Sequence, residues 1–294
     1  MRLAFAAAAL FAAAVLTTGC GSEREAVKLE TVTLAANKTE AVGTARVQFE
    51  GSVTFNHDHE QRYEFRGKGV VDWETGSAEL SATYKFSNQI QEFIKEQFGG
   101  PATADLILDQ REGIVLYVRF PFLKEHMPKG KEWLKADIVE IGKAYGLDLD
   151  RMKETKRTNP DNMLDYLKSA VGVRKVGTDL VRREVTTHYS TVVKAETIIA
   201  QSPKSQQEAM RKYLRLFGIK TYPVDIWVDR DGLVRKLSME LEYKVPRGDY
   251  VKMKVSEEYF DFGVPVEIEP PPAKRVLDVT ECLCPQRDEG RLSA

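Results

Sequence analysis

Residues 45–55 read ARVQFEGSVTF, and apolar and polar side chains alternate along most of this stretch. Successive side chains of a β-strand point to opposite faces. One face therefore receives four apolar residues and the other four polar ones: Val47, Phe49, Val53 and Phe55 against Gln48, Glu50, Ser52 and Thr54. This period of two predicts a half-buried strand with one face on a core.

The same alternation returns twice in the next thirty residues. Residues 63–73 read YEFRGKGVVDW and residues 77–86 read SAELSATYKF. Short polar segments, HDHEQ at 57–61 and ETGS at 74–77, separate the three runs. Alternating runs joined by short turns are typical of an antiparallel meander with one polar and one apolar face.

The rest of the chain extends this sheet and inserts helices into it. Strand patterns follow at 104–110, 113–120, 173–181, 184–196, 221–229, 233–245 and 250–263, and helical patterns at 29–41, 88–100 and 204–218. The segment 121–170 is interpreted mainly as loop and helix. Hairpin turns are expected at Arg182-Arg183 and at Asp229-Arg230-Asp231-Gly232.

We therefore expect an α+β fold in one domain, spanning residues 29–268. Its nine or ten antiparallel strands share one apolar face, and such a sheet has to curl or be covered. The inserted helices are the available cover. The expected architecture is a curled half-barrel covered by helices, whose apolar interior is either a filled core or a cavity.

The N-terminus has the layout of a secretory signal peptide. Residues 1–20 read MRLAFAAAALFAAAVLTTGC, with one cation at Arg2 and an apolar run from Leu3 to Leu16. That run is shorter than the roughly 20 residues a spanning helix needs. Residues 1–19 resemble a lipoprotein signal, with Cys20 as the site of palmitate-type acylation and 20–28 as a tether, although Thr17 stands where lipoboxes carry Leu, Val or Ile. Ordinary cleavage nearby is the alternative.

The C-terminal residues 269–294 are expected to be a disordered tail, because they begin with EPPPAK. They contain Cys282 and Cys284, which are too close for an easy disulfide and lack the second half of a zinc ribbon. An exposed thiol pair and a redox or intermolecular role both stay open.

Composition and motifs exclude several functions. The 43 basic and 44 acidic side chains leave a formal net charge of -1, which argues against nucleic acid as the main partner. The chain has no G-x-S-x-G, H-E-x-x-H, Walker A or G-x-G-x-x-G motif. We therefore name no catalytic residue and expect neither a cofactor nor enzymatic activity.

Three polar clusters are candidate sites. The run 56–60, NHDHE, has metal-ligand residue types but lies in a turn, and Asp225, Asp229 and Asp231 lack the terminal glutamate of an EF-hand loop. In EVTTHYSTVV (184–193), alternation places His188 on the more polar face, with Val185, Thr187, Tyr189, Thr191 and Val193 facing inward. No orienting acid is evident for His188, so no metal or catalytic site is predicted.

Three longer motifs carry a resemblance to a known family. GKEWLKAD (130–137), VGTDLVRREVTTHYSTV (176–192) and YPVDIWVDRDGLVRKLSMEL (222–241) resemble the actinobacterial LppX/LprG-type lipoproteins of the LolA-like superfamily. The resemblance covers most of residues 30–262. It implies a half-barrel of antiparallel strands, covered by helices, around a hydrophobic cavity for acyl chains. Some members carry envelope lipids or lipoglycans.

These observations favour a lipoprotein anchored in the cell membrane on its extracytoplasmic face, which binds or carries a lipid or acylated molecule. Its expected partners are the membrane, through Cys20, a lipid or lipoglycan ligand, and an envelope transporter or acceptor protein. The candidate lining residues are Val47, Phe49, Phe65, Leu80, Tyr84, Leu116, Val118, Leu237, Met239 and Leu241. The rival is a surface interaction or scaffold module with a solid core. A hydrolase built from the loops of 121–170 is a weaker third option.

Overall fold

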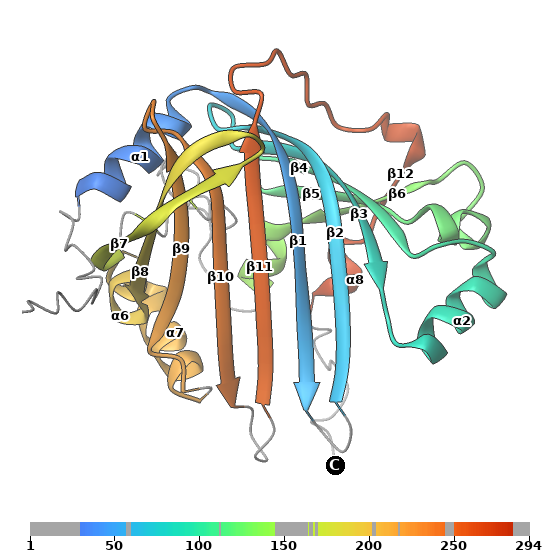
Figure 1. Cartoon of the computed structure of the whole chain (residues 1–294). Helices are drawn as coiled ribbons and strands as arrows, with labels where there is room; N and C mark the ends of the chain where they lie inside the picture. Colours follow the sequence, from blue (N-terminus) through green and yellow to red (C-terminus); the bar gives the residue numbers. More distant parts are fainter. Residues whose placement is uncertain are drawn as a thin grey trace, which may run out of the picture.

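The computed structural model describes residues 30–56, 60–111, 113–144, 164, 167, 170–201, 204–216, 218–244 and 250–284. Within these ranges twelve strands form one sheet in the order β12-β6-β5-β4-β3-β2-β1-β11-β10-β9-β8-β7. The central strands stand side by side, and the strands on both flanks curve away from them without meeting (Figure 1). The predicted curled, unclosed sheet with helices is confirmed.

Strands β1 to β6 neighbour one another in chain order, as do β7 to β11, and the two runs join where β1 pairs with β11. Their bounds are β1 Thr44–Asn56, β2 Glu60–Asp72, β3 Ser77–Lys85, β4 Thr103–Asp109, β5 Val115–Arg119, β6 Trp133–Asp137, β7 Ala170–Val181, β8 Glu184–Lys194, β9 Thr221–Asp229, β10 Val234–Lys244, β11 Tyr250–Phe260 and β12 Val276–Asp278. Neighbouring strands are antiparallel, apart from β12 and β6, which are parallel.

The helices are short and lie between strands. They are α1 Glu30–Glu40, α2 Asn88–Phe98, α3 Ile138–Ala144, α6 Ala195–Gln201, α7 Lys204–Leu216 and α8 Thr280–Leu283, with 3-10 turns η1 Pro121–His126 and η2 Ala273–Arg275. The helix α1 packs against the inner, concave face of the sheet. There Val32, Ala35 and Ala36 join the main core with Leu164 and Leu167.

Two sequence-based expectations are wrong. Residues 133–137 form strand β6 rather than loop or helix, because they pair with β5 on one side and β12 on the other. The expected disordered tail is ordered over its first part: β12 and α8 lie in residues 269–284, and Lys135 pairs with Asp278 at 2.8 Å. These added strands raise the count from nine or ten to twelve. Residues 285–294 are outside the described ranges.

The segment that leads to β12 crosses the outer, convex face of the sheet (Figure 1). Its Ile268 is buried on Ile107 of β4 and Trp133 of β6, and Val70 and Tyr117 pack beside them. An apolar patch on an otherwise polar face is costly unless it is covered. The C-terminal segment supplies that cover, which accounts for its order.

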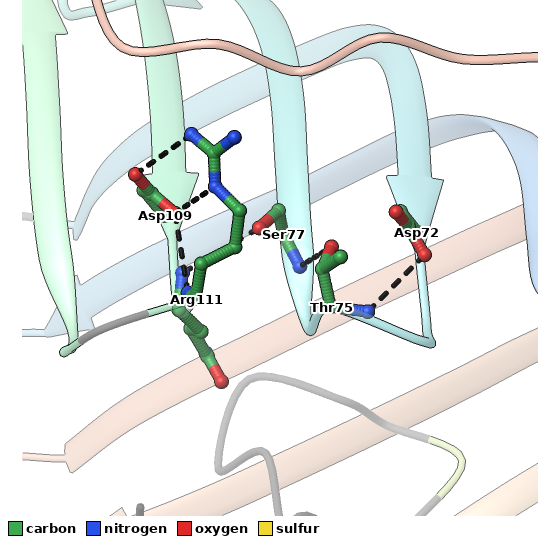
Figure 2. A network of polar contacts seen from close by, with 6 residues as sticks. Asp72, Thr75, Ser77, Asp109 and Arg111 are labelled. Carbon is green, nitrogen blue, oxygen red and sulfur yellow. Dashed lines mark hydrogen bonds and ion pairs between the residues drawn. The ribbon is translucent and has the colours of Figure 1, made fainter.

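Local side chains close the turns at one end of the sheet (Figure 2). Between β2 and β3, Asp72 accepts hydrogen bonds from the backbone of Glu74 and Thr75, at 2.9 and 3.3 Å. After β4, the Asp109 carboxylate accepts from Nε and Nη2 of Arg111 at 2.9 and 3.0 Å. This bond lowers the pKa of the Asp109 carboxyl. Both loops are thereby held in short, defined turns.

The predicted hairpin at Arg182-Arg183 is confirmed. Both residues have positive φ, 48° and 72°, and Val181 pairs with Glu184 across them. This geometry normally favours glycine or asparagine. Arg182 compensates by docking on the outer face of the sheet: its guanidinium donates to Glu258 at 3.0 Å and to Gln48, and lies 3.8 Å from the centre of the Phe260 ring.

Candidate functional site

The concave face of the sheet is the candidate site, because the strand register gathers the apolar side chains there. Phe49 of β1 stands opposite Gly67 of β2, and Phe65 of β2 stands between Gly51 and Tyr84. The same face continues onto β4 and β5, where Leu106 lies opposite Val118. All ten candidate lining residues lie on this face: Val47, Phe49, Phe65, Leu80, Tyr84, Leu116, Val118, Leu237, Met239 and Leu241.

One end of this face is filled. Val47 and Leu237 are fully buried in the main core, where α1 covers them, and Leu80 and Met239 pack at its edge. Leu241 is also buried, whereas the other candidates are only partly covered. Part of the predicted lining is therefore packed core in the described residues.

The opposite end of the face carries a row of aromatic side chains. Phe55 contacts Tyr63 edge to face, with ring centres 5.8 Å apart, and Tyr63 contacts Phe86 in the same manner at 5.9 Å. Phe86 stacks on Tyr84 at 6.2 Å. Phe55 remains 42% exposed. We call Phe55, Tyr63, Tyr84 and Phe86 the aromatic rim.

Exposure is lowest at the filled end of β1 and highest at this rim. Val47 is 4% exposed, Phe49 and Val53 are intermediate, and Phe55 is 42% exposed. Within the described residues Phe55 therefore keeps apolar surface in contact with solvent, whereas Val251, which pairs with it on β11, is only 4% exposed. Three rim residues, Phe55, Tyr63 and Phe86, were missing from the sequence-based candidates, although the alternation in β1, β2 and β3 places them on the same face as those candidates.

Two glycines let the aromatic side chains of β1 and β2 lie flat on the sheet. A Cβ on Gly67 would come within 2.3 Å of Cζ of Phe49, and a Cβ on Gly51 within 2.4 Å of Cζ of Phe65. The two rings themselves lie 6.4 Å apart. Each glycine therefore provides the room that the ring on the neighbouring strand occupies.

A polar pair interrupts the apolar face at its filled end. The buried Tyr259 hydroxyl donates a hydrogen bond to the carboxylate of Glu257, which stands between Leu237 and Phe49 in the register. Burial raises the pKa of Tyr259 well above its ordinary value, and the Glu257 charge raises it further. The phenol is thus held as a neutral donor that satisfies a carboxylate on the concave face.

His188 does have partners, contrary to the sequence-based expectation. Its Nε2 lies 3.1 Å from Asp225 and its Nδ1 lies 3.4 Å from Asp179, while its ring stacks on Trp227 at 4.3 Å. Trp227 also donates to Asp179 at 2.9 Å. Because a carboxylate faces each ring nitrogen, both nitrogens are occupied by structural contacts between strands. The cluster joins β7, β8 and β9.

The inward assignment of 185–193 is right for part of β8 only. Thr191 and Val193 are buried and Tyr189 packs on the main core, but Val185 is 44% exposed. On the other side of β8, Thr186 is 1% exposed, and its hydroxyl donates a hydrogen bond to the carbonyl of Asp179. The reason is that the end of the hairpin folds over the outer face, where Arg182 docks, and so turns its former inner side to solvent.

Residues 229–232 form the turn between β9 and β10. Asp229 caps the β9–β10 turn by accepting from the backbone of Leu233 at 2.9 Å, and it pairs with Arg235 at 2.5 Å. Most of the run 56–60 lies outside the described residues. Among the described residues, no group of three or more His, Cys, Asp or Glu side chains could hold a metal ion.

A hollow on the outer face has a different character. It lies over β11, β1, β2 and β3 and is lined mainly by charged and hydroxyl side chains, including Arg66, Lys254, Glu50 and Ser256. Arg62 and Lys85 at its margin both pair with Glu64. Such a surface keeps its water and offers little to an acyl chain.

The N-terminal segment and the cysteines are only partly described. Cys20 and the signal region lie outside the described residues. Among the helices that are described, none has the length and apolar character to cross a bilayer. Cys282 is exposed and Cys284 partly buried, and both are free thiols.

No protein-family description matches this sequence. Two curated proteins are similar: an uncharacterised 31.2 kDa protein of Streptomyces griseus, 32% identical over 163 residues, and a candidate lipoprotein of Streptomyces coelicolor, 32% identical over 162 residues. These matches cover 52% and 53% of this chain, and 50% and 46% of the relatives. The chain thus spans about half the length of the curated relatives it matches.

Solved structures are similar at low sequence identity. LprF of Mycobacterium bovis matches 83% of this chain and 96% of its own, at 10% identity and a TM-score of 0.42. LppX of Mycobacterium tuberculosis matches 83% and 100%, at 11% identity and 0.34. A LolA superfamily protein of Nitrosomonas europaea matches 82% and 96%, at 8% identity and 0.30. A mycobacterial lipoprotein, LppX, and a protein of the LolA superfamily are thus both among the structures similar to this chain.

Proposed function

We propose that this chain is a lipid-anchored protein on the extracytoplasmic face of the cell membrane, and that it holds a lipid or acylated molecule on the concave face of its sheet. The observation that carries the proposal is the uneven filling of that face. Its Val47 end is packed under α1, whereas Phe55 in the aromatic rim is 42% exposed. A module with a solid core would have no reason to leave apolar surface at one end only.

The driving force would be burial of apolar surface. Water released from an acyl chain and from the rim contributes about 25 cal/mol per Å² of area removed from solvent. Aromatic rings suit this role because they are large and rigid and contact an alkyl chain across their faces. The partly covered Phe49, Phe65 and Tyr84 extend the same surface inward along β1, β2 and β3.

The anchor in this proposal is Cys20. It follows an apolar segment with the layout of a signal peptide, and a relative that is 32% identical is named as a candidate lipoprotein. Two or three acyl chains on one cysteine give a stable attachment without any contribution from the folded domain. The tether 20–28 would then separate the bilayer from α1.

Binding in this proposal involves no covalent step. The polar cluster at His188 has carboxylates at both ring nitrogens and lies on the outer face rather than beside the aromatic rim. The contacts of the concave face instead offer shape and apolar area. They suit a carrier that takes up and releases its ligand unchanged.

Solvent extraction and native mass spectrometry test the proposal on protein purified from its own membrane. We expect a lipid or acylated molecule to be released in a near-equimolar amount. A preparation that carries no lipid, and that also takes up no fluorescent fatty-acid probe, would contradict ligand binding. Separately, Cys20→Ala should release the protein from the membrane, and its retention there would refute the anchor.

A further inference from the structure

The hairpin of β7 and β8 exposes apolar side chains to an unusual degree. Of the eight large apolar side chains that are exposed in the described residues, three belong to this hairpin. Leu180 is 71% exposed, Val185 44% and Val176 43%. Leu180 and Val185 stand opposite each other in the register, so they form one patch rather than scattered contacts.

The outward orientation of this patch is built into the fold. Arg182 at the hairpin tip is tied to Glu258 and Gln48 and lies on the Phe260 ring, and Thr186 and Val181 are buried beneath the hairpin. The side of the hairpin that carries Leu180 and Val185 is consequently directed away from the sheet. Rotating the patch inward would break these contacts.

The charge of the hairpin differs from that of the whole chain. Residues 170–194 contain five basic side chains and two acidic ones, whereas the chain as a whole has a formal net charge of -1. Arg174, Lys175 and Arg183 are exposed. An apolar patch on a hairpin with an excess of cations matches an anionic bilayer, which accepts apolar side chains below a layer of phosphate groups.

The edge of the sheet argues against a second protein strand as the occupant. β7 is the last strand of the sheet, but its pairing with β8 shifts register at two places, between Val171 and Arg174 and between Lys175 and Gly177. Such bulges interrupt the row of backbone groups that an added strand needs. The patch is thus better suited to a surface that requires no hydrogen-bond register.

We propose that the β7–β8 hairpin docks the folded domain on an anionic phospholipid surface, with Leu180 and Val185 inserted among the headgroups and the neighbouring cations on phosphates. This inference extends the proposed function and rests on it, because the Cys20 anchor is what keeps the hairpin close to the bilayer. α1 contacts β7, and the nine residues 21–29 reach at most about 32 Å from Cys20. The folded domain can therefore lie on the leaflet that holds the anchor.

The test uses the full chain with Cys20→Ala, so that no acyl anchor contributes. Sedimentation with vesicles of phosphatidylcholine and phosphatidylglycerol in equal parts measures binding, and phosphatidylcholine vesicles are the comparison. We expect binding to the anionic vesicles only. The pair Leu180→Ser and Val185→Ser should weaken it about tenfold, since each side chain loses part of its transfer free energy. Arg183→Gln should weaken it mainly at low salt.

Leu34→Ser is the matched control, because Leu34 is 63% exposed on α1, outside the patch formed by Leu180 and Val185. Equal binding by the Leu180/Val185 variant and the parent protein would overturn the proposal, and so would equal losses in the Leu34 control. Failure of the parent protein to bind either vesicle would also overturn it. Fatty-acid probe binding, measured on the same variants, reports the concave face separately and should not change.

Discussion

Replacing Phe55 by serine tests whether the aromatic rim contacts the ligand. Phe55 is 42% exposed at the open end of the concave face. A phenylalanine side chain presents about 200 Å² of surface, so about 80 Å² is available to an acyl chain. At about 25 cal/mol per Å², covering that area contributes at most ~2 kcal/mol. We therefore expect Phe55→Ser to weaken binding by up to about 30-fold.

Displacement of a fluorescent fatty-acid probe measures this change. Phe55→Leu should keep most of the affinity, because it preserves an apolar side chain at the same position. Leu34→Ser removes an exposed apolar residue from α1, outside the concave face, and should leave binding unchanged. Phe55→Ser also loses the edge-to-face contact with Tyr63, about 1 kcal/mol, so thermal unfolding must first show that the variant is folded.

The reasoning fails if folded Phe55→Ser binds the probe within twofold of the parent protein. It also fails if Phe55→Leu loses as much affinity as Phe55→Ser, because the effect would then follow the loss of the ring contact with Tyr63 rather than the loss of apolar area. A ligand seated only on the partly covered Phe49 and Phe65 would produce the first result.

Three further predictions concern stability. Tyr259→Phe should lower the free energy of unfolding, measured in urea, by about 1–2 kcal/mol, because Glu257 loses a buried donor. The pKa of Tyr259 is raised in the folded state, so the parent protein should lose stability as pH rises above about 10. The variant should not show this loss. The pKa of Asp278 is lowered from 3.8 to about 2 by Lys135 and Thr280, so its contribution is full above about pH 4 and lost toward pH 2. Because the Asp278 side chain is 51% exposed, we expect this contribution to be less than about 1 kcal/mol. Hydrogen-exchange protection factors of the β12 amides, which are corrected for the intrinsic pH dependence of exchange, should fall between about pH 4 and pH 2 in the parent protein and fall less in Lys135→Gln. Gly67→Ala should cost about 1–3 kcal/mol in thermal unfolding, and adding Phe49→Leu should recover only part of it, because the Ser81 carbonyl oxygen, 2.4 Å from the new Cβ, belongs to the backbone; full recovery would contradict this reasoning.

The central strands could be predicted because their pattern is local and long. β1 has thirteen residues, and its alternation continues with the same period through β2 and β3. By contrast, β6 has five residues, too few to separate a period of two from a helical period. Its partner β12 lies about 140 residues later in the chain, and no local pattern reports such a pairing.

The surroundings of His188 could not be predicted for a related reason. Asp225 lies 37 residues away, on β9. It reaches His188 because the chain leaves β8 through α6 and α7 and then returns as β9, antiparallel to β8. The exposure of Val185 depends on an ion pair between residues that lie even farther apart in the sequence, Arg182 and Glu258. Alternation assigns a residue to one side of its strand. It does not show where the strand bends so far that this side faces solvent.

The glycines of β1 and β2 connect these points to the site. A strand face made only of bulky side chains would pack its rings upright, and the concavity would fill. Gly51 and Gly67 have no side chain, so the rings of Phe65 and Phe49 lie over them from the neighbouring strand. The surface there is apolar but does not project into the concavity. In the sequence these glycines weaken the strand pattern, since glycine is a poor strand former. In the folded sheet they make room for the rings of Phe49 and Phe65, so the residues that weaken the strand pattern are the ones that shape the proposed binding face.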